Sequence, residues 1–514
     1  MRRRFWSPEV GIGLGIWLYL MVVGRSRLFR DPGSFWHKVV GRRILDGAGF
    51  FATDPFSFTQ DGRPWIAQQW LGECAMAVVD RLSGLDGLLL GTVTILAVLY
   101  AWMAHRLLRG GLGWLPSTVL VLVGVGTSAI HFHVRPMIAT IFAFGLTCAW
   151  LVDVDSGRRP TRWLWWLVPV FLIWTNTHGG VLGGLATLAL AVGGWWLLGL
   201  AGRDSPASSL GRGIELGSIV GACGLTFLVN PYGVRMPASW VEIMASPVIP
   251  RMIIEHAPPR ADDPATWMIG GLGLIYGIAL VGVPVRRWRV TWLIAPIWLA
   301  LTISRVRNAP LFGVAALVGL ADIIPESRLG DWLGRPGRDL FRRPRVGVVR
   351  GIDLSWIGPA VLVAVALGLQ IAGARVPVLG RGWAGLDPGY WPVELLPELR
   401  KTTEGGARPH FFNEDILGGF LIDQVPGALV FTDDRCELYG DDWLTRYDRA
   451  ERDPEALMRW LSEYRVDDAL VRTGSGYDRA FRGRPGWAIV REAGPATLYR
   501  RIESPARGLA GRSD

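Results

Sequence analysis

The chain is dominated by apolar runs that are long enough to cross a lipid bilayer. Half of its 514 residues are hydrophobic, and the mean hydropathy is +0.29. Runs of about 16 to 22 mostly apolar residues recur, which is the length that an α-helix needs to span a hydrocarbon core of about 30 Å. The sequence therefore predicts an α-helical polytopic membrane protein.

We predict eleven spans, and the first follows Arg2, Arg3 and Arg4 without the A-x-A-like cleavage site of a signal peptide. The spans lie near 10–23, 84–104, 115–131, 136–152, 163–177, 180–200, 214–229, 266–284, 290–304, 309–324 and 354–373. The long apolar stretch 163–200 makes two spans only if residues 177–180 form a turn. An error there would invert the predicted topology of everything that follows.

The distribution of arginine predicts the orientation. With the N-terminus in the cytoplasm, alternate loops are rich in arginine, as the positive-inside rule requires. These loops contain Arg106 and Arg109, Arg158, Arg159 and Arg162, Arg203 and Arg212, Arg286, Arg287 and Arg289, and the Arg-rich segment 325–353. Orientation in the cytoplasmic (inner) membrane therefore explains the sequence pI of 9.9, and nucleic acid is not an expected partner.

The tail after the last span differs in composition from the rest. Acidic pairs appear, and short strand-like runs at 428–432, 469–472, 487–491 and 496–500 alternate with a helical segment at 454–464. We predict a transmembrane domain, 1–373, followed by a small extracytoplasmic α/β domain, 374–514.

The first extracytoplasmic loop, 25–83, is long and rich in aromatic residues. Its apolar residues recur at helical spacing, which favours short interfacial helices with Trp and Phe at headgroup depth. This loop, the shorter outer loops and the ends of the spans carry nearly all the polar clusters. Polar groups near hydrocarbon are costly and are kept where they line a site. Their concentration at one end of the spans therefore predicts a functional site at that end.

Several segments resemble bacterial multi-spanning glycosyltransferases of the GT-C class. The resemblance rests on the first loop with Asp31, Trp36-His37 and 53–58, and on later landmarks at 174–180, 230–233, 255–259, 305–310, 416–421 and 437–441. The chain departs from the pattern in two places. A second acidic residue is absent two positions after Asp31, and Gln68-Gln69 stands where His-Glu is expected before Trp70.

The resemblance implies transfer of a hexosyl or pentosyl group from a polyprenyl-phosphate donor to a lipid, glycan or protein acceptor, next to membrane lipids. A carboxylate would take the acceptor proton, with Asp31 the first candidate and Asp54 the second. Arginines would hold the phosphate, because their planar fork donates to two oxygens. The expected binding residues are His37, Gln69, His131, His133, Arg135, Asn176, His178, Asn230, Tyr232, Glu255, Arg305, Arg307 and Asn308.

Each candidate also has a purely structural interpretation. Asp31 and Asp54 each precede a proline, as turn and capping residues do. Asn176 and His178 can tie helices together, and Asn230-Pro231 is a helix-ending signal. Arg305 and Arg307 can extend toward lipid headgroups. His131 and His133 do not share a helical face, so we assign no metal site to them. The sequence does not exclude a requirement for a divalent cation.

Two other functions fit the same composition. A lipid or glycan transporter or flippase also combines many spans with buried charge, but it should show internal repeats and charges near the membrane midplane, which the sequence lacks. The other alternative is a catalytically inactive GT-C relative, which the two departures in the first loop would explain.

Overall fold

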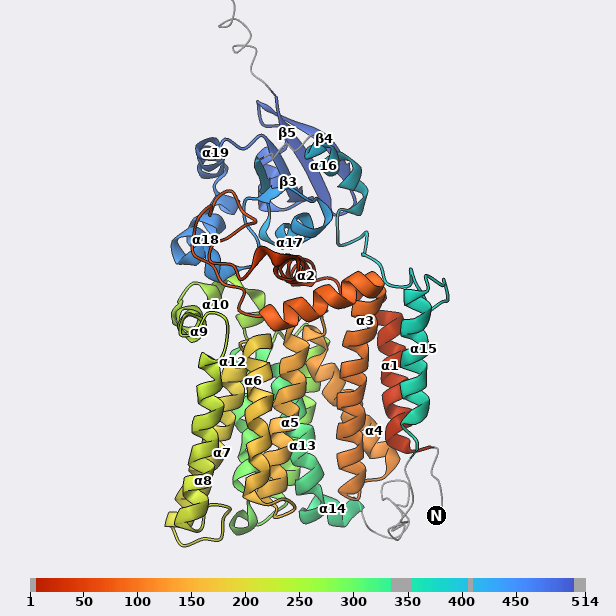
Figure 1. Cartoon of the computed structure of the whole chain (residues 1–514), viewed down its shortest axis with the longest axis vertical. Coiled ribbons are helices and arrows are strands. Elements are labelled where there is room, and N and C mark those ends of the chain that lie inside the picture. Colours follow the sequence, from red (N-terminus) through yellow and green to blue (C-terminus); the bar gives the residue numbers. More distant parts are fainter. Residues whose placement is uncertain (1–5, 334–353, 405–409, 503–514) are drawn as a thin grey trace, which may run out of the picture.

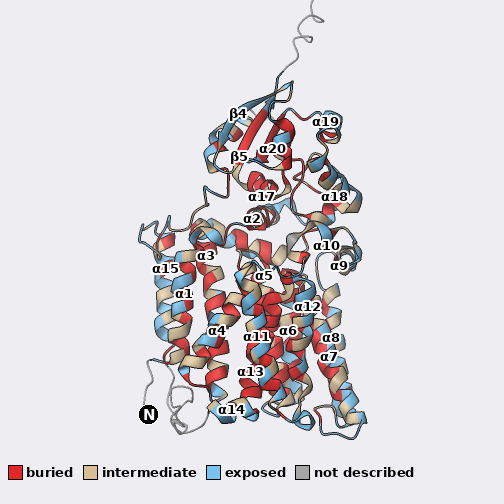
Figure 2. Ribbon diagram, turned by 180° about the vertical axis from the view of Figure 1, so that it is seen from behind, coloured by how far each residue is buried: buried red, intermediate tan, exposed pale blue. Residues whose placement is uncertain are grey.

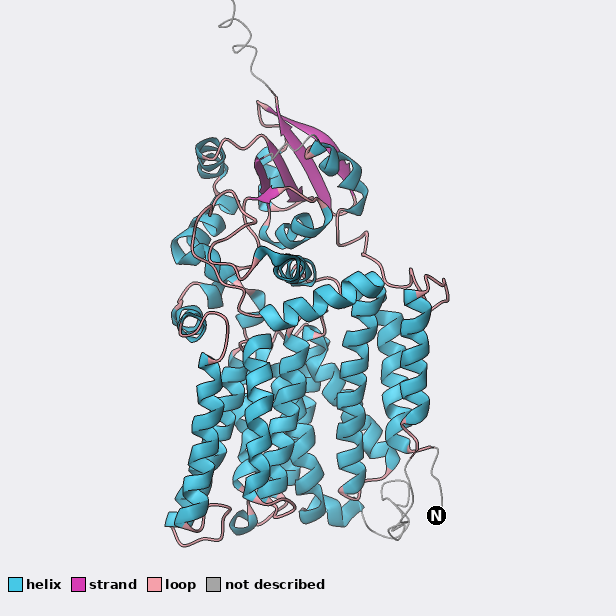
Figure 3. Cartoon of the chain, viewed as in Figure 1, coloured by secondary structure: helices cyan, strands magenta, loops and turns pink. Residues whose placement is uncertain are grey.

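The computed structural model describes residues 6–333, 354–404 and 410–502. A bundle of long helices carries a smaller domain at one end, and the described strands that form a sheet all lie in that domain (Figures 1 and 3). We call the end of the bundle that contacts this domain the junction end, and the opposite end the distal end.

Eleven helices of the described residues correspond to the eleven predicted spans. They are α1 (Pro8–Arg27), α3 (Trp70–Arg109), α4 (Trp114–Ser128), α5 (Met137–Asp155), α6 (Leu167–Thr177), α7 (Val181–Leu200), α8 (Leu210–Leu225), α11 (Pro264–Val281), α12 (Ile294–Ser304), α13 (Ala309–Ile323) and α15 (Ile357–Ile371). Helix α6 ends and α7 begins on either side of residues 178–180, so the predicted division of the stretch 163–200 is confirmed.

Length and composition alone mark seven helical segments in the described part of the chain as able to cross a membrane. Two shorter apolar helices, Val290–Ser304 and Ile357–Ile371, accompany them, and α6 and α8 are 11 and 16 residues long. The predicted loop 325–353 begins with α14 (Arg328–Leu333), and its residues 334–353 lie outside the described residues.

Helix α13 lies at the centre of the bundle. All 15 of its residues are buried, and it packs against α3, α4, α5, α11 and α12. The outer faces of the peripheral helices carry exposed apolar residues such as Leu200 and Val281 (Figure 2). Apolar residues on both faces are the pattern of a bundle that is solvated by lipid.

Helix α3 bends sharply at Gly84, where φ is +62°, a conformation that residues with a Cβ rarely adopt. Its first part, up to the bend, lies across the junction end, and the remainder runs through the bundle (Figure 1). Helix α2 (Gly33–Arg43) packs against α3, and a Cβ added at Gly41 would lie 2.0 Å from the Glu73 carbonyl oxygen. The bend and this close approach place α2 between the bundle and the C-terminal domain.

The C-terminal domain contains a five-stranded sheet in the order β2-β1-β3-β5-β4. Strand β1 is parallel to both of its neighbours, and β5 is antiparallel to both of its own. The elements are α16 (Leu396–Lys401), β1 (His410–Asn413), α17 (Asp415–Gln424), β2 (Leu429–Val430), α18 (Cys436–Arg452), α19 (Pro454–Glu463), β3 (Asp468–Arg472), α20 (Gly476–Phe481), β4 (Trp487–Ala493) and β5 (Ala496–Arg501). The four predicted strands and the predicted helix are present, and β1 is a strand that the sequence reading missed.

The first outer loop differs from its expected form. Helical structure covers α2 with the π-type turn Ile44–Ala48, and it resumes at Trp70, but residues 49–69 form turns. Phe56 accepts from the Val430 amide at 3.0 Å, and the Phe58 amide donates to Val430 at 3.3 Å, so this loop extends the sheet beyond β2. Residues 56–58 therefore pack on the C-terminal domain instead of lying as an interfacial helix.

One apolar cluster joins this loop to the C-terminal domain. It includes Phe35, Trp36 and Trp65 from the loop together with Phe411 and Phe420 from the domain. Between them, Lys38 and Arg42 of α2 contact the buried carboxylate of Asp423. The loop and the domain thus share a core above the bundle.

Candidate active site at the junction end

The polar clusters singled out in the sequence meet at the junction end from separate loops. Asp31 precedes α2, the segment 131–135 joins α4 to α5, and His178 lies between α6 and α7. The short helix Ile254–His256 and the turn Val306–Asn308 complete the set. Segments far apart in the sequence therefore form a single site beneath the C-terminal domain.

Asp31 and Arg135 form the central ion pair. Arg135 Nη1 donates to Asp31 Oδ2 at 2.7 Å, and the Gly33 amide at the start of α2 donates to Asp31 Oδ1 at 2.8 Å. Burial alone would lower the pKa of Arg135, but Asp31 and Glu255 raise it above its ordinary value. Because each carboxylate oxygen has two lone pairs, Asp31 keeps the capacity to accept a further hydrogen bond.

Glu255 lies near the same nitrogen of the Arg135 guanidinium. Its Oε1 lies 4.0 Å from Arg135 Nη1 and 3.7 Å from His131 Nδ1. Burial alone would raise the pKa of Glu255, but Arg135, His131 and Arg307 together hold it below its ordinary value. Glu255 is thus a carboxylate that stays charged among cations.

Arg307 and His256 contact each other at the edge of this cluster through Nη1 and Nε2. Burial, followed by the charges of Arg307 and Arg305, lowers the pKa of His256 to about 4. His256 is therefore neutral at pH 7, and Nε2 can accept from the guanidinium.

His178 is fixed in one tautomer. Its Nδ1 accepts from the Gly180 amide at 3.0 Å and lies 2.9 Å from Thr140 Oγ1. Burial, with Arg135 and Arg307 nearby, lowers the pKa of His178 to about 3. The neutral ring therefore carries its proton on Nε2, where it can serve as a donor.

His37 lies on α2 against the first part of α3. Its Nδ1 is 2.9 Å from Glu73 Oε1, and both side chains are buried. Burial, with Arg135 and His178 as further causes, lowers the pKa of His37 well below its ordinary value. Burial also raises the pKa of Glu73 well above its ordinary value, so the His37 and Glu73 side chains share one proton in this hydrogen bond. The sequence analysis did not single out Glu73.

Four histidine ring nitrogens at this end are buried without a hydrogen-bond partner within the described residues: His37 Nε2, His131 Nε2, His133 Nδ1 and His256 Nδ1. Buried polar atoms in native proteins are nearly always paired, so these nitrogens have hydrogen-bonding capacity left for water or a polar ligand. No group of three or more His, Cys, Asp or Glu residues in the described part of the chain is arranged to hold a metal ion.

The C-terminal domain adds a carboxylate that the sequence reading did not assign to the site. Asp434 Oδ1 accepts from Trp36 Nε1 at 2.9 Å. Burial first, then the neighbouring Asp31 and Asp433, raise the pKa of Asp434 well above its ordinary value. Asp434 is thus an acid that stays protonated to a higher pH than Asp or Glu usually does, next to Asp31.

Asp54 lies in a separate, fully buried network. Its carboxylate accepts from the Phe56 and Ser57 amides and from Arg435 Nη1, the last at 2.7 Å. Arg435 also donates to Asp433 through Nε and Nη2. The arrangement joins the first outer loop to the C-terminal domain, and the Asp54 side chain is 0% exposed.

The other sequence candidates hold the backbone in place. Asn176 accepts from Trp70 Nε1 at 2.7 Å and donates to the Leu172 and Val229 carbonyls, and Asn230 closes the turn that follows α8. The Tyr232 hydroxyl accepts a hydrogen bond from the Ala67 amide, and the Gln69 carbonyl accepts one from the Glu73 amide at the start of α3. Asn308 donates to the Leu301 carbonyl. Arg305 differs from these residues, because its side chain is exposed.

No protein-family model matches the sequence, and no curated protein matches it. The structure is similar to that of the archaeal oligosaccharyltransferase AglB from Archaeoglobus fulgidus, in complex with an inhibitory peptide and a dolichol-phosphate. That comparison gives a TM-score of 0.53 and 10% identity, and it covers 90% of this chain and 69% of that chain.

A lower similarity is found to ArnT from Cupriavidus metallidurans bound to undecaprenyl phosphate, with a TM-score of 0.43, 12% identity, and 96% and 98% of the two chains covered. At these identities the likeness concerns the fold. The expectation from the sequence is confirmed at that level: the chain has a fold of the GT-C type found in membrane glycosyltransferases.

Proposed function

We propose that this protein is a membrane glycosyltransferase that moves a sugar from a polyprenyl-phosphate donor to a lipid, glycan or protein acceptor at the outer face of the cytoplasmic membrane. The observation that carries the proposal is the Asp31–Arg135 pair. It lies at the junction end of a GT-C-type fold, among cations and buried histidine nitrogens that have no hydrogen-bond partner among the described residues.

Asp31 is the proposed general base. The acceptor hydroxyl would give its proton to the Asp31 carboxylate while its oxygen bonds to the anomeric carbon of the sugar. The bond from that carbon to the phosphate oxygen breaks, and its electron pair leaves with the polyprenyl phosphate. Asp54 is a weaker candidate, because its carboxylate is enclosed by Arg435 and two backbone amides.

Arg135 and Arg307 are the proposed partners of the departing phosphate. Both face the cluster around Glu255, and guanidinium groups bind phosphate oxygens in pairs. The neutral His178 would add an uncharged donor through Nε2. The C-terminal domain, 374–514, would cover the site and exclude water, since Asp434 and the packing of α17 on α2 bring it directly against Asp31.

Sugar transfer by purified protein in lipid vesicles, from a panel of radiolabelled polyprenyl-phosphate sugars, tests the proposal. Asp31→Asn should lower the rate about 10²- to 10⁴-fold without unfolding the protein. Absence of transfer from every donor by the folded wild-type protein would instead favour a carrier or an inactive relative. Transfer that is unchanged in Asp31→Asn would remove Asp31 from the role of base.

A further inference from the structure

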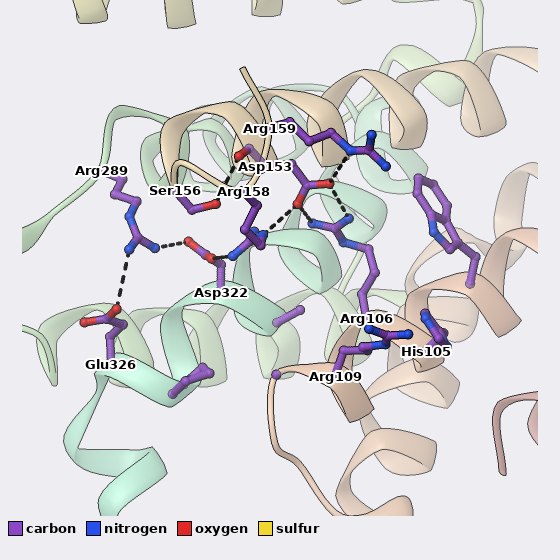
Figure 4. Close-up of a pocket in the computed structure, with 14 residues that line it drawn as sticks. His105, Arg106, Arg109, Asp153, Ser156, Arg158, Arg159, Arg289, Asp322 and Glu326 are labelled. Atoms are coloured by element: carbon purple, nitrogen blue, oxygen red, sulfur yellow. Dashed lines mark hydrogen bonds and ion pairs between the residues drawn. The ribbon is translucent and has the colours of Figure 1, made fainter. Parts of the chain in front are cut away.

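The distal end of the bundle contains a cavity of about 540 Å³ that is rich in arginine. Its volume lies within the range of small-molecule sites. Five arginines and His105 line it together with only three carboxylates, and Figure 4 shows the side chains gathered from α3, α5, the loop after α5 and α13. The lining arginines are Arg106, Arg109, Arg158, Arg159 and Arg289.

The carboxylates make their shortest contacts with three of these arginines. Asp153 accepts from Arg106 at 2.8 Å and from Arg158 at 2.9 Å, and Asp322 accepts from Arg158 at 2.5 Å and contacts Arg289. Arg289 also lies 3.4 Å from Glu326. These ion pairs hold the walls of the cavity in place. They also balance the negative charge of the three carboxylates, so the lining keeps a net positive charge.

Arg109 and Arg159 supply the excess positive charge. Among the residues drawn in Figure 4, no dashed line joins Arg109 to a carboxylate, and its side chain is exposed at the cavity. Arg159 is 3.9 Å from Asp153 and stacks on the Trp163 ring at 3.7 Å. Both guanidinium groups line the same cavity, and a guanidinium group is a good partner for a phosphate group.

A groove on the neighbouring face of α3 favours a lipid over a soluble phosphate. The groove, of about 410 Å³, lies between α1, α3 and α15 and is lined almost wholly by apolar residues, among them Trp17, Val98 and Ala101. Ala101 is one helical turn from His105, which lines the arginine-rich cavity. An acyl chain in the groove and a phosphate at Arg109 can therefore belong to one molecule.

We propose that the distal end binds an anionic phospholipid, with its phosphate at Arg109 and Arg159 and an acyl chain in the groove between α1, α3 and α15. Basic pockets between membrane helices are suited to anionic headgroups. The site is separate from the junction end, and the inference does not depend on the proposed glycosyl transfer.

Titration of the purified full-length protein in detergent tests this site, with bound lipid counted by native mass spectrometry. Phosphatidylglycerol should bind more tightly than phosphatidylcholine of the same chain length. Arg109→Ala should weaken phosphatidylglycerol binding about fivefold, the effect of about one arginine near a membrane surface. Arg109→Lys, which keeps the charge but lacks the guanidinium fork, should bind more tightly than Arg109→Ala. Arg212→Ala, which removes an arginine outside the cavity, should remain close to wild type.

Two further measurements separate a lipid from a free phosphate. Val98→Trp should fill the groove and weaken phosphatidylglycerol binding while leaving Arg109 intact. Glycerol phosphate and inorganic phosphate, which lack the chain, should not displace the lipid. The proposal is overturned if phosphatidylcholine binds as tightly as phosphatidylglycerol, or if Arg109→Ala binds phosphatidylglycerol as wild type does. It is also overturned if glycerol phosphate alone displaces the lipid completely, because that result would assign the cavity to a soluble phosphate ester. Thermal unfolding without added lipid confirms that each variant is folded.

Discussion

The two ends of the bundle contain similar residue types in different arrangements. At the distal end, the carboxylate of Asp153 meets three arginines and that of Asp322 meets two, and the resulting network faces an open cavity. At the junction end, Asp31 and Glu255 share Arg135, and several histidine nitrogens around them lack partners within the described residues. Charge density is therefore similar at both ends. The proposed active site differs in its buried histidines and in the domain that covers it.

The sharpest test of this comparison substitutes one aspartate at each end. Asp31→Asn should lower sugar transfer about 10²- to 10⁴-fold, because an amide cannot take the acceptor proton. Asp155→Asn is the matched control, since Asp155 lies at the distal end and accepts from the Thr291 amide and hydroxyl. The control should transfer at the wild-type rate per folded molecule. Equal losses in both variants would contradict the assignment of the reaction to the junction end.

The attachment of the C-terminal domain can be broken at Arg435. Arg435→Met should destabilise the protein by about 3–5 kcal/mol, because it leaves the buried carboxylates of Asp54 and Asp433 without their cation. Chemical denaturation followed by tryptophan fluorescence measures the loss. Arg452→Met, at an exposed pair with Asp448, should change the stability by less than about 0.5 kcal/mol. A mild effect of Arg435→Met would show that the apolar cluster alone holds the loop and the domain together.

A smaller effect is expected at Asn176, which ties α6 to α3 and to the end of α8. Asn176→Ala should cost about 1–3 kcal/mol, because Trp70 Nε1 and the Val229 carbonyl lose the hydrogen bonds that the Asn176 side chain makes. Because the side chain is satisfied by the protein, the rate of transfer per folded molecule should not change. A loss of rate without a loss of stability would instead return Asn176 to the substrate-binding residues.

The last expected effect is a slope of stability with pH at the junction end. His178 and His256 have pKa values of about 3 and 4 in the folded protein, below the usual 6.5. The unfolded chain therefore binds more protons between these values, so stability is full above pH 6.5 and falls as the pH drops toward 4. Each group contributes at most about 1.4 kcal/mol per pH unit. Thermal unfolding of His178→Gln should show a shallower slope than wild type, and an unchanged slope would exclude His178 as a source.

The sequence by itself determined the bundle and much of the domain order. The length and spacing of the apolar runs predicted eleven helices, including the division at residues 177–180, because backbone in hydrocarbon has few alternatives to a helix. The change in composition after the last span predicted the strands of the tail. The missed strand, His410–Asn413, follows a segment outside the described residues and is too short to show a clear alternation.

The membership of the site was decided only in three dimensions. Asp31, Arg135, Glu255 and His178 were candidates from sequence, but so was Asp54, and the local signals of Asp31 and Asp54 are alike because each precedes a proline. The structure separates them: Asp31 meets Arg135 across the bundle end, whereas Asp54 is enclosed by Arg435, more than 380 residues away along the chain. Asp434 and Glu73 joined the cluster for the same reason. Hydropathy and helix length are properties of neighbouring residues, whereas the partner of a buried charge is set by how distant segments pack.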